Sequence, residues 1–148
     1  MAGNKPLTAI TVHCSASSPD IFVDAKVIDR WHRARGFFKI GYHYVILRDG
    51  TIQKGREDTE VGAHVEGHNT GNLGICLVGG VNKAGKAEMN FTDDQMHTLA
   101  ELILKLKKQY HSITNVLGHR DWPGVRKACP SFDVKSWWHD TVAAPDLS

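Results

Sequence analysis

Histidine and cysteine are the residues of this sequence that could carry chemistry. The 148 residues include nine histidines and three cysteines, and the histidine content is well above ordinary usage. Histidine suits both metal binding and proton transfer near neutral pH. We expect His13 at the end of one strand, His119 directly after another, and Cys129 in the loop that follows His119. Two imidazoles and one thiolate are zinc ligands, and three protein ligands leave the fourth tetrahedral position for water, as in catalytic zinc sites.

The residue types alone leave other interpretations open. The sequence contains neither HExxH nor CxxC, so the same residues could be unrelated surface histidines and a buried thiol. Cys129 and His119 could also act as nucleophile and base of a thiol hydrolase. The cysteines Cys14, Cys76 and Cys129 are widely spaced and odd in number, so no disulfide framework is expected.

The elements that must position these residues alternate between strands and helices, which predicts a mixed α/β (α+β) fold. Ile10, Val12 and Cys14 alternate with Thr11 and His13, as in a strand with a buried face. Turn, cap and periodicity signals predict the other elements. These are a helix from the cap Asp24 to about Arg35, a hairpin over 42–55 with a two-residue type I′ turn at Asp49-Gly50, a central strand over 73–80, a helix from the capping box Thr92/Gln95 to about Tyr110, a strand at 113–118 and a helix at 133–139.

Length and composition indicate one globular domain with a core over about residues 8–140 and a flexible tail over 141–148. The chain is 41% hydrophobic and 23% charged, which argues against disorder. A net charge of +2 does not point to nucleic acid as a partner. No apolar run is long enough for a membrane span and no signal peptide is apparent, so we expect synthesis in the cytoplasm.

Four segments resemble the zinc-dependent N-acetylmuramoyl-L-alanine amidases, in particular the short phage lysozyme-type endolysins. The segments are VHCSAS (12–17), GYHYVILRDGT (41–51), VGAHVEGHNTGNLGICLVGG (61–80) and GHRDWPGVRKACPSFD (118–133). The resemblance implies a single domain with a central sheet flanked by helices and a zinc groove on one side. It also implies one Zn²⁺ per chain, with His13, His119 and Cys129 as ligands.

The resemblance further implies a reaction and roles for residues beside the metal. The bond cut would be the amide between N-acetylmuramic acid and the L-alanine of the stem peptide, which lyses the cell wall. Lys127 would offer a positive charge to the oxyanion, and Tyr42 would orient water or the leaving nitrogen. His64 and Asn69 are expected to border the peptide groove as substrate contacts. Related wall-recycling amidases have a glutamate base where this chain has Cys76, so the general base stays open.

Other functions of the chain stay open, and several cysteines, tryptophans and histidines are expected to have structural roles. The chain could be a non-catalytic peptidoglycan-binding module, or could also bind and inhibit a phage RNA polymerase. We expect a monomer that acts on the wall after holin-type release. Core packing is expected for Cys14, Cys76 and at least one of Trp137 and Trp138, and a hydrogen-bonded structural role for His43. Surface or capping positions are expected for His32, His97, His111 and His139.

Overall fold

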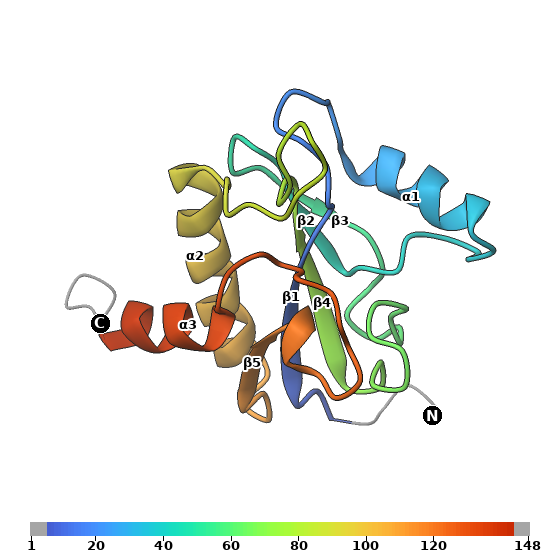
Figure 1. The fold of residues 1–148 in the computed structure, drawn as a ribbon. Helices are drawn as coiled ribbons and strands as arrows, with labels where there is room; N and C mark the ends of the chain where they lie inside the picture. Colours follow the sequence, from blue (N-terminus) through green and yellow to red (C-terminus); the bar gives the residue numbers. More distant parts are fainter. Residues whose placement is uncertain (1–5, 144–148) are drawn as a thin grey trace.

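The strand β4 (Asn72–Leu77) lies at the centre of a five-stranded sheet, as its almost uninterrupted apolar sequence predicts. The computed structural model describes residues 6–143, and the strand order is β3-β2-β4-β1-β5 (Figure 1). All six residues of β4 are buried. β1 is parallel to β4 and β5, β2 is parallel to β4, and β3 is antiparallel to β2. The other strands are β1 (Ala9–Cys14), β2 (Tyr44–Ile46), β3 (Ile52–Lys54) and β5 (Asn115–Gly118).

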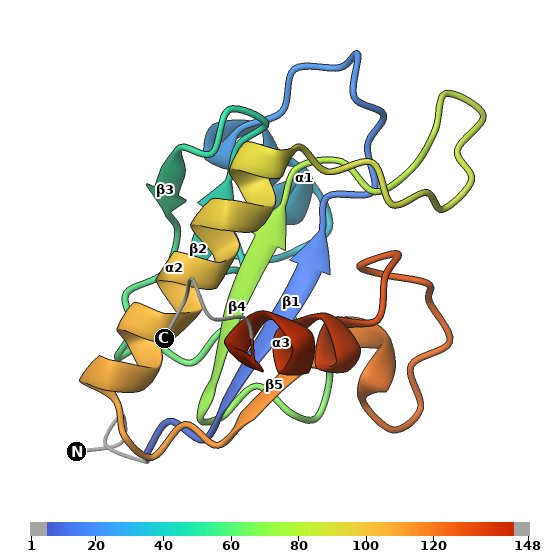
Figure 2. The same cartoon turned by 90° about the vertical axis from the view of Figure 1, so that its left-hand side faces the viewer.

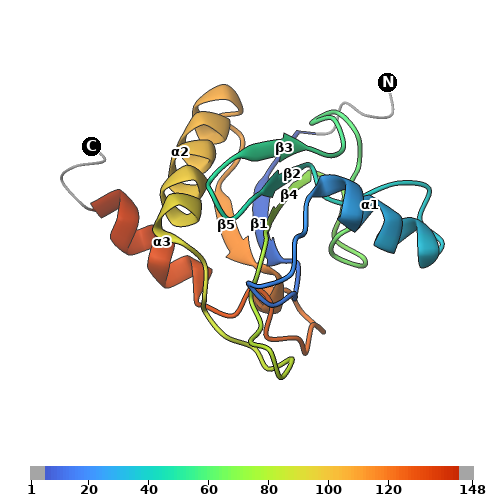
Figure 3. The same ribbon diagram turned by 90° about the horizontal axis from the view of Figure 1, so that it is seen from above.

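Helices cover the two faces of the sheet unequally. α2 (Asp93–Gln109) and α3 (Val134–Ala143) lie on one face (Figure 2), and α1 (Ala25–Ala34) lies on the other (Figure 3). The larger apolar cluster lies under α2 and α3, whereas the smaller one under α1 includes Ile28, Val45 and Cys76. Because side chains alternate along a strand, Thr11 and His13 point away from the α2 face. Polar groups therefore lie on the face that has the smaller core.

The start of α2 is held on the sheet by Gln95, whose side chain is fully buried. Thr92 and Gln95 form the predicted capping box. The Gln95 amide nitrogen also donates to the backbone carbonyls of Ile46 (3.1 Å) and Val78 (2.9 Å). One side chain thus caps the helix and bonds the last residue of β2 and the residue that follows β4.

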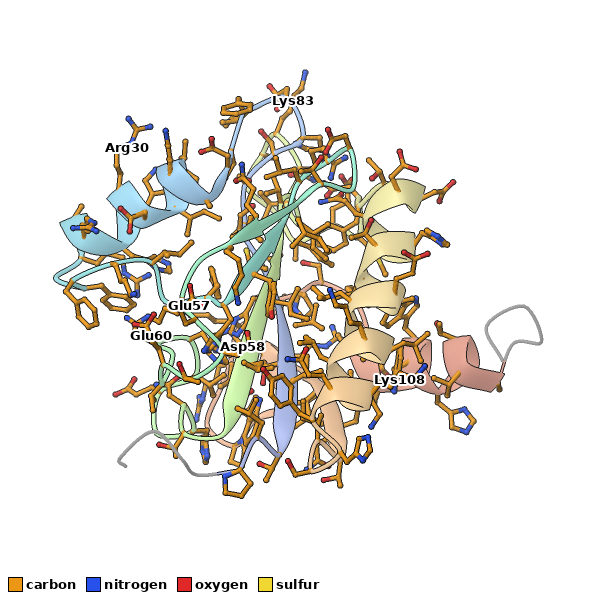
Figure 4. The ribbon with its side chains drawn as sticks, turned by 180° about the vertical axis from the view of Figure 1, so that it is seen from behind. Arg30, Glu57, Asp58, Glu60, Lys83 and Lys108 are labelled. Carbon is orange, nitrogen blue, oxygen red and sulfur yellow. The ribbon has the colours of Figure 1, made fainter. Side chains whose placement is uncertain are left out.

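A carboxylate joins the loop after β3 to the sheet and to the end of α2. The Asp58 carboxylate accepts hydrogen bonds from the hydroxyls of Tyr44 (2.6 Å) and Tyr110 (2.7 Å) and from Lys54 Nζ (2.9 Å). Figure 4 shows Asp58 close to Glu57 and Glu60 in this loop. Burial alone would raise the pKa of Asp58, but the three hydrogen bonds outweigh it and lower the pKa.

Two local predictions differ from the structure. The predicted type I′ turn is wrong, because Gly50 has a φ of 89° while Asp49 does not have a positive φ. Leu47 N–H donates to the Thr51 carbonyl and Gly50 N–H to the Leu47 carbonyl, which closes a three-residue loop with glycine in the left-handed position. α3 continues to Ala143, so residues 141–143 are helical and not part of a tail. The rest of the predicted tail lies outside the described residues.

The other predicted elements are confirmed with end shifts of a few residues. Trp137 and Trp138 pack against the larger core cluster, as expected for at least one of them. Cys14 packs in the same cluster, and Cys76 is fully buried. His43 is a structural residue, because its Nδ1 accepts from Gly74 N–H and its Nε2 bonds the Glu60 carbonyl. Among residues 6–143, no helix is long and apolar enough to cross a membrane.

Candidate metal centre

The fold brings together His13, His119 and Cys129, which are far apart in the sequence. His13 lies near the carboxyl end of β1, and His119 begins the 3₁₀ helix η1 (His119–Asp121), directly after β5. β1 and β5 are parallel neighbours, so their carboxyl ends meet at the same edge of the sheet. The loop that carries Cys129 passes over this edge (Figure 1). One ligand atom from each residue lies within 4.8 Å of the other two.

Hydrogen bonds from backbone N–H groups hold the loop that supplies the sulfur. The Cys14 N–H donates to Cys129 Sγ at 3.1 Å, which ties the loop to the end of β1. The Arg120 N–H donates to the Cys129 carbonyl at 2.9 Å, and Asp121 Oδ2 accepts from Gly118 N–H at 2.8 Å. These bonds hold the loop near its start and at Cys129, and they keep the sulfur beside the end of β1.

The donor types fit a zinc ion. Zinc bonds to imidazole nitrogen at about 2.0–2.1 Å and to thiolate sulfur at about 2.3 Å. Three atoms within 4.8 Å of one another can contact one such ion after small side-chain rotations. Among the described residues, this cluster is the one group of three or more His, Cys, Asp or Glu side chains placed to hold a metal, and it contains no carboxylate.

The surroundings keep the histidines neutral, the form that binds metals. Burial is the main cause that lowers the pKa of His13 well below its usual value, with His64 and His119 adding to it. Burial, and then the charge of Lys127, lower the pKa of His119. The neighbouring Cys14 thiol and burial raise the pKa of Cys129, so its thiolate form requires a cation beside it. A metal ion bound by the two histidines would be such a cation.

The side chain of His64 contacts the ring of His13. The His13 Nε2 and His64 Nδ1 atoms are 2.9 Å apart, and His64 Nε2 is 2.8 Å from the backbone carbonyl oxygen of Asn72. His64 is buried, and burial is the main cause that lowers its pKa to about 3. Asn69 shapes this turn, because its Oδ1 accepts from the backbone N–H groups of His64 and Val65, both at 2.8 Å.

A cleft of about 670 Å³ opens beside the ligand cluster. Tyr42, Lys127, His64 and Asn69, all selected from the sequence, line it together with the ligand His119. The other lining residues are His32, Arg35, Phe37, Ala63, Glu66 and residues 123–126. Three of the lining side chains are basic, Arg35, Arg126 and Lys127, and one, Glu66, is a carboxylate. This balance favours an anionic ligand.

Tyr42 and Cys76 lie on the ligand side of the sheet. The Tyr42 and His13 rings are 4.9 Å apart, and burial raises the pKa of Tyr42 well above its usual value, so the phenol stays protonated. Cys76 pairs with His13 in the β1–β4 register and is fully buried. Burial raises its pKa, so this thiol is neutral and cannot replace a carboxylate base.

The expectation of a surface or capping position for His32 is wrong. Its side chain is buried, lines the cleft, and accepts a hydrogen bond at Nδ1 from Gly41 N–H (2.9 Å). His32 follows Ile28 by one helical turn and therefore shares its buried face, a spacing that could have found it. Arg35, Phe37 and residues 123–126 were also missed, and no sequence pattern marked them.

Comparisons with known proteins show which family this chain belongs to. The sequence profile described as N-acetylmuramoyl-L-alanine amidase matches residues 3–132. The endolysin of Klebsiella phage KP32 is 45% identical over 129 residues, which cover 87% of this chain and 83% of that one. The endolysin of Escherichia phage T7 is 44% identical over 130 residues, covering 88% and 84%. The N-acetylmuramoyl-L-alanine amidase LysC from Clostridium intestinale superposes with a TM-score of 0.80 at 28% identity, covering 97% and 89%.

Proposed function

Since the chain belongs to the N-acetylmuramoyl-L-alanine amidase family, we propose that His13, His119 and Cys129 hold one zinc ion for the cleavage of peptidoglycan. The chain is an endolysin-type amidase, which hydrolyses the amide bond between N-acetylmuramic acid and the L-alanine of the stem peptide. The observation that carries the zinc proposal is the convergence of two imidazoles and a thiol, within 4.8 Å, beside an open cleft. A bound zinc ion would polarise the scissile carbonyl and lower the pKa of water.

The residues beside the ligands supply the rest of the chemistry. The exposed Lys127 lines the cleft, and its ammonium would stabilise the negative charge that develops on the carbonyl oxygen. Tyr42 keeps its proton, so its hydroxyl would donate a hydrogen bond to the leaving nitrogen or accept one from the attacking water. No carboxylate belongs to the ligand cluster in the part of the chain that the structure describes, so we assign no carboxylate general base.

The cleft holds the stem peptide. Stem peptides carry free carboxylates, and Arg35 and Arg126 offer two charges on the cleft wall that attract them. We propose that Asn69 acts mainly by shaping the turn, since its Oδ1 already accepts two backbone hydrogen bonds. His64 borders the cleft but directs both ring nitrogens into the protein.

The setting of the reaction completes the proposal. The endolysin relatives support the cell wall as the site of action. We propose that the enzyme is made in the host cytoplasm, reaches the wall through a holin-type lesion and works as a monomer. Inhibition of a phage RNA polymerase stays a prediction.

A peptide-release assay with metal analysis tests the function. Purified protein is incubated with peptidoglycan, released stem peptides are quantified by mass spectrometry, and bound zinc is measured in the same sample. We expect one zinc per chain and loss of peptide release after chelation, restored by added zinc. Cys129→Ser should lose both zinc and activity, whereas His97→Gln, on the exposed face of α2, should keep both. Equal release with and without chelator would overturn the zinc proposal. Inactivation of metal-free, active protein by alkylation would instead indicate a thiol hydrolase.

A further inference from the structure

The hydrogen bonds that connect His13, His64 and Asn72 determine which ring nitrogen of His13 carries the proton. A backbone carbonyl can only accept, so the 2.8 Å contact between the Asn72 oxygen and His64 Nε2 requires a proton on His64 Nε2. In a neutral His64 the other nitrogen, Nδ1, then carries a lone pair. His13 Nε2 lies 2.9 Å from that lone pair and must therefore donate its proton to it. The remaining nitrogen of His13, Nδ1, is left as the metal-binding atom.

We infer that His64 is a positioning residue that holds His13 in the tautomer protonated on Nε2 and so presents its Nδ1 lone pair to the metal. The inference rests on the proposed zinc function. Metal-binding histidines generally donate their second ring N–H to a carboxylate, a carbonyl or water, which fixes the ring and raises the basicity of the ligand. Here the acceptor is the neutral imidazole of His64, which in turn donates a hydrogen bond to the Asn72 carbonyl in β4.

The protein builds a closed slot for the His64 ring. A Cβ atom at Gly74 would lie 2.7 Å from His64 Cγ, and one at Gly62 would lie 2.6 Å from His64 Cδ2. Real Cβ contacts are not this short, so the ring fits because both neighbours lack a side chain. Asn69 holds the backbone of His64 from the other side. The close approach of Gly62 and Gly74 and the bond from Asn69 to the backbone therefore hold the His64 ring in place in addition to its bond with His13.

The alternative is that His64 only fills space between β1, β4 and the loop. A space-filling role needs the shape of the ring but not its nitrogens. Two substitutions separate the roles. His64→Phe keeps a ring and removes the acceptor, whereas His64→Gln keeps an acceptor for His13 and a donor for the Asn72 carbonyl in a side chain of similar reach.

The first experiment reads the tautomer directly in metal-free wild-type protein labelled with ¹⁵N-histidine. Two-bond ¹⁵N–¹H correlation spectra distinguish the protonated from the unprotonated ring nitrogen. We expect both His13 and His64 to be protonated on Nε2. A proton on Nδ1 of His13 would overturn the inference, and this result does not depend on whether any variant folds or whether zinc binds.

The second experiment measures zinc affinity by competition with a chromophoric chelator. We expect His64→Phe to bind zinc about 10- to 100-fold more weakly than wild type and to show mixed His13 tautomers. His64→Gln should recover most of the affinity, and His97→Gln should match wild type. Equal affinity and an unchanged His13 tautomer in a folded His64→Phe protein would overturn the inference. Absence of zinc binding by wild type would instead overturn the proposed function, while the tautomer spectra would still decide the role of His64.

Discussion

Adding one methyl group to the sheet at Gly74 should destabilise the protein through its contact with His64. A Cβ at this position would lie 2.7, 2.8 and 2.9 Å from three atoms of the His64 ring. Glycine-to-alanine substitution at an unstrained site ordinarily stabilises by about 0.4–1 kcal/mol, because it restricts the unfolded chain. Gly74 lies within β4 and does not have a positive φ, so backbone strain does not oppose the substitution.

The expected magnitude follows from the two ways in which the clash can be relieved. If the His64 ring stays in its slot, overpacking costs about 1–3 kcal/mol. If the ring leaves, it loses its two hydrogen bonds, at about 0.5–1.5 kcal/mol each. Both routes cost about 2 kcal/mol, and the gain from the unfolded chain offsets part of this. We therefore expect Gly74→Ala to lower the free energy of unfolding by about 1–2 kcal/mol.

A double-mutant cycle tests the reasoning. The free energy of unfolding is measured by urea titration for wild type, Gly74→Ala, His64→Ala and the double variant. If the ring causes the loss, Gly74→Ala should be neutral or slightly stabilising once His64 is truncated, with a coupling energy of about 2 kcal/mol. Gly74→Ala causing the same loss in both backgrounds would refute the proposed contact with His64.

Two further predictions concern polar groups that hold the fold together. Gln95→Leu keeps the side-chain volume but removes the hydrogen bonds of the buried amide to the Ile46 and Val78 carbonyls and to the Thr92 N–H, so urea titration should show a loss of about 2–4 kcal/mol; a loss under about 0.5 kcal/mol would contradict this role. Tyr110→Phe should cost about 1 kcal/mol at neutral pH, because it removes one hydrogen bond from the Asp58 carboxylate. The pKa of Asp58 is lowered in the folded protein, so its stabilisation is present above the unfolded carboxyl pKa of about 3.9 and is lost as pH falls toward the folded value. The difference between wild type and Tyr110→Phe should shrink below about pH 4, and a constant difference across pH would contradict the assignment.

Elements with strong local signals could be predicted from the sequence. The capping box at Thr92 and Gln95 and the apolar spacing behind it fixed the position of α2, because both signals depend only on residues within the helix. The apolar run of β4 predicted a central strand for the same reason. The Asp49-Gly50 signal predicted a hairpin but not its loop type, since both loop types place glycine at a positive φ.

The site depends on contacts that local patterns do not encode. Residue types and spacing left His13, His119 and Cys129 open to three interpretations, and only the resemblance of whole segments to a family favoured one. The His13–His64 hydrogen bond joins residues 51 positions apart and follows from how the loop folds back over β4. The buried position of His32 was missed because it was assigned to the surface from its place on a helix alone, without its one-turn spacing from the buried Ile28.

The two faces of the sheet differ in the size of their apolar clusters, and this difference explains how the chain can bury many polar side chains on one face. The α2 face contains the larger apolar cluster and therefore most of the hydrophobic stabilisation. On the other face, the Trp122 indole N–H donates to Thr11 Oγ1, and Thr11 in turn donates to Asn72 Oδ1. Within residues 6–143, no buried side-chain nitrogen or oxygen lacks a partner. A buried polar network in which every group is bonded adds rigidity, whereas one missing partner would cost about 1–3 kcal/mol. The ligands of the candidate metal centre therefore lie in a preorganised polar layer, and its geometry does not have to be created by the ion.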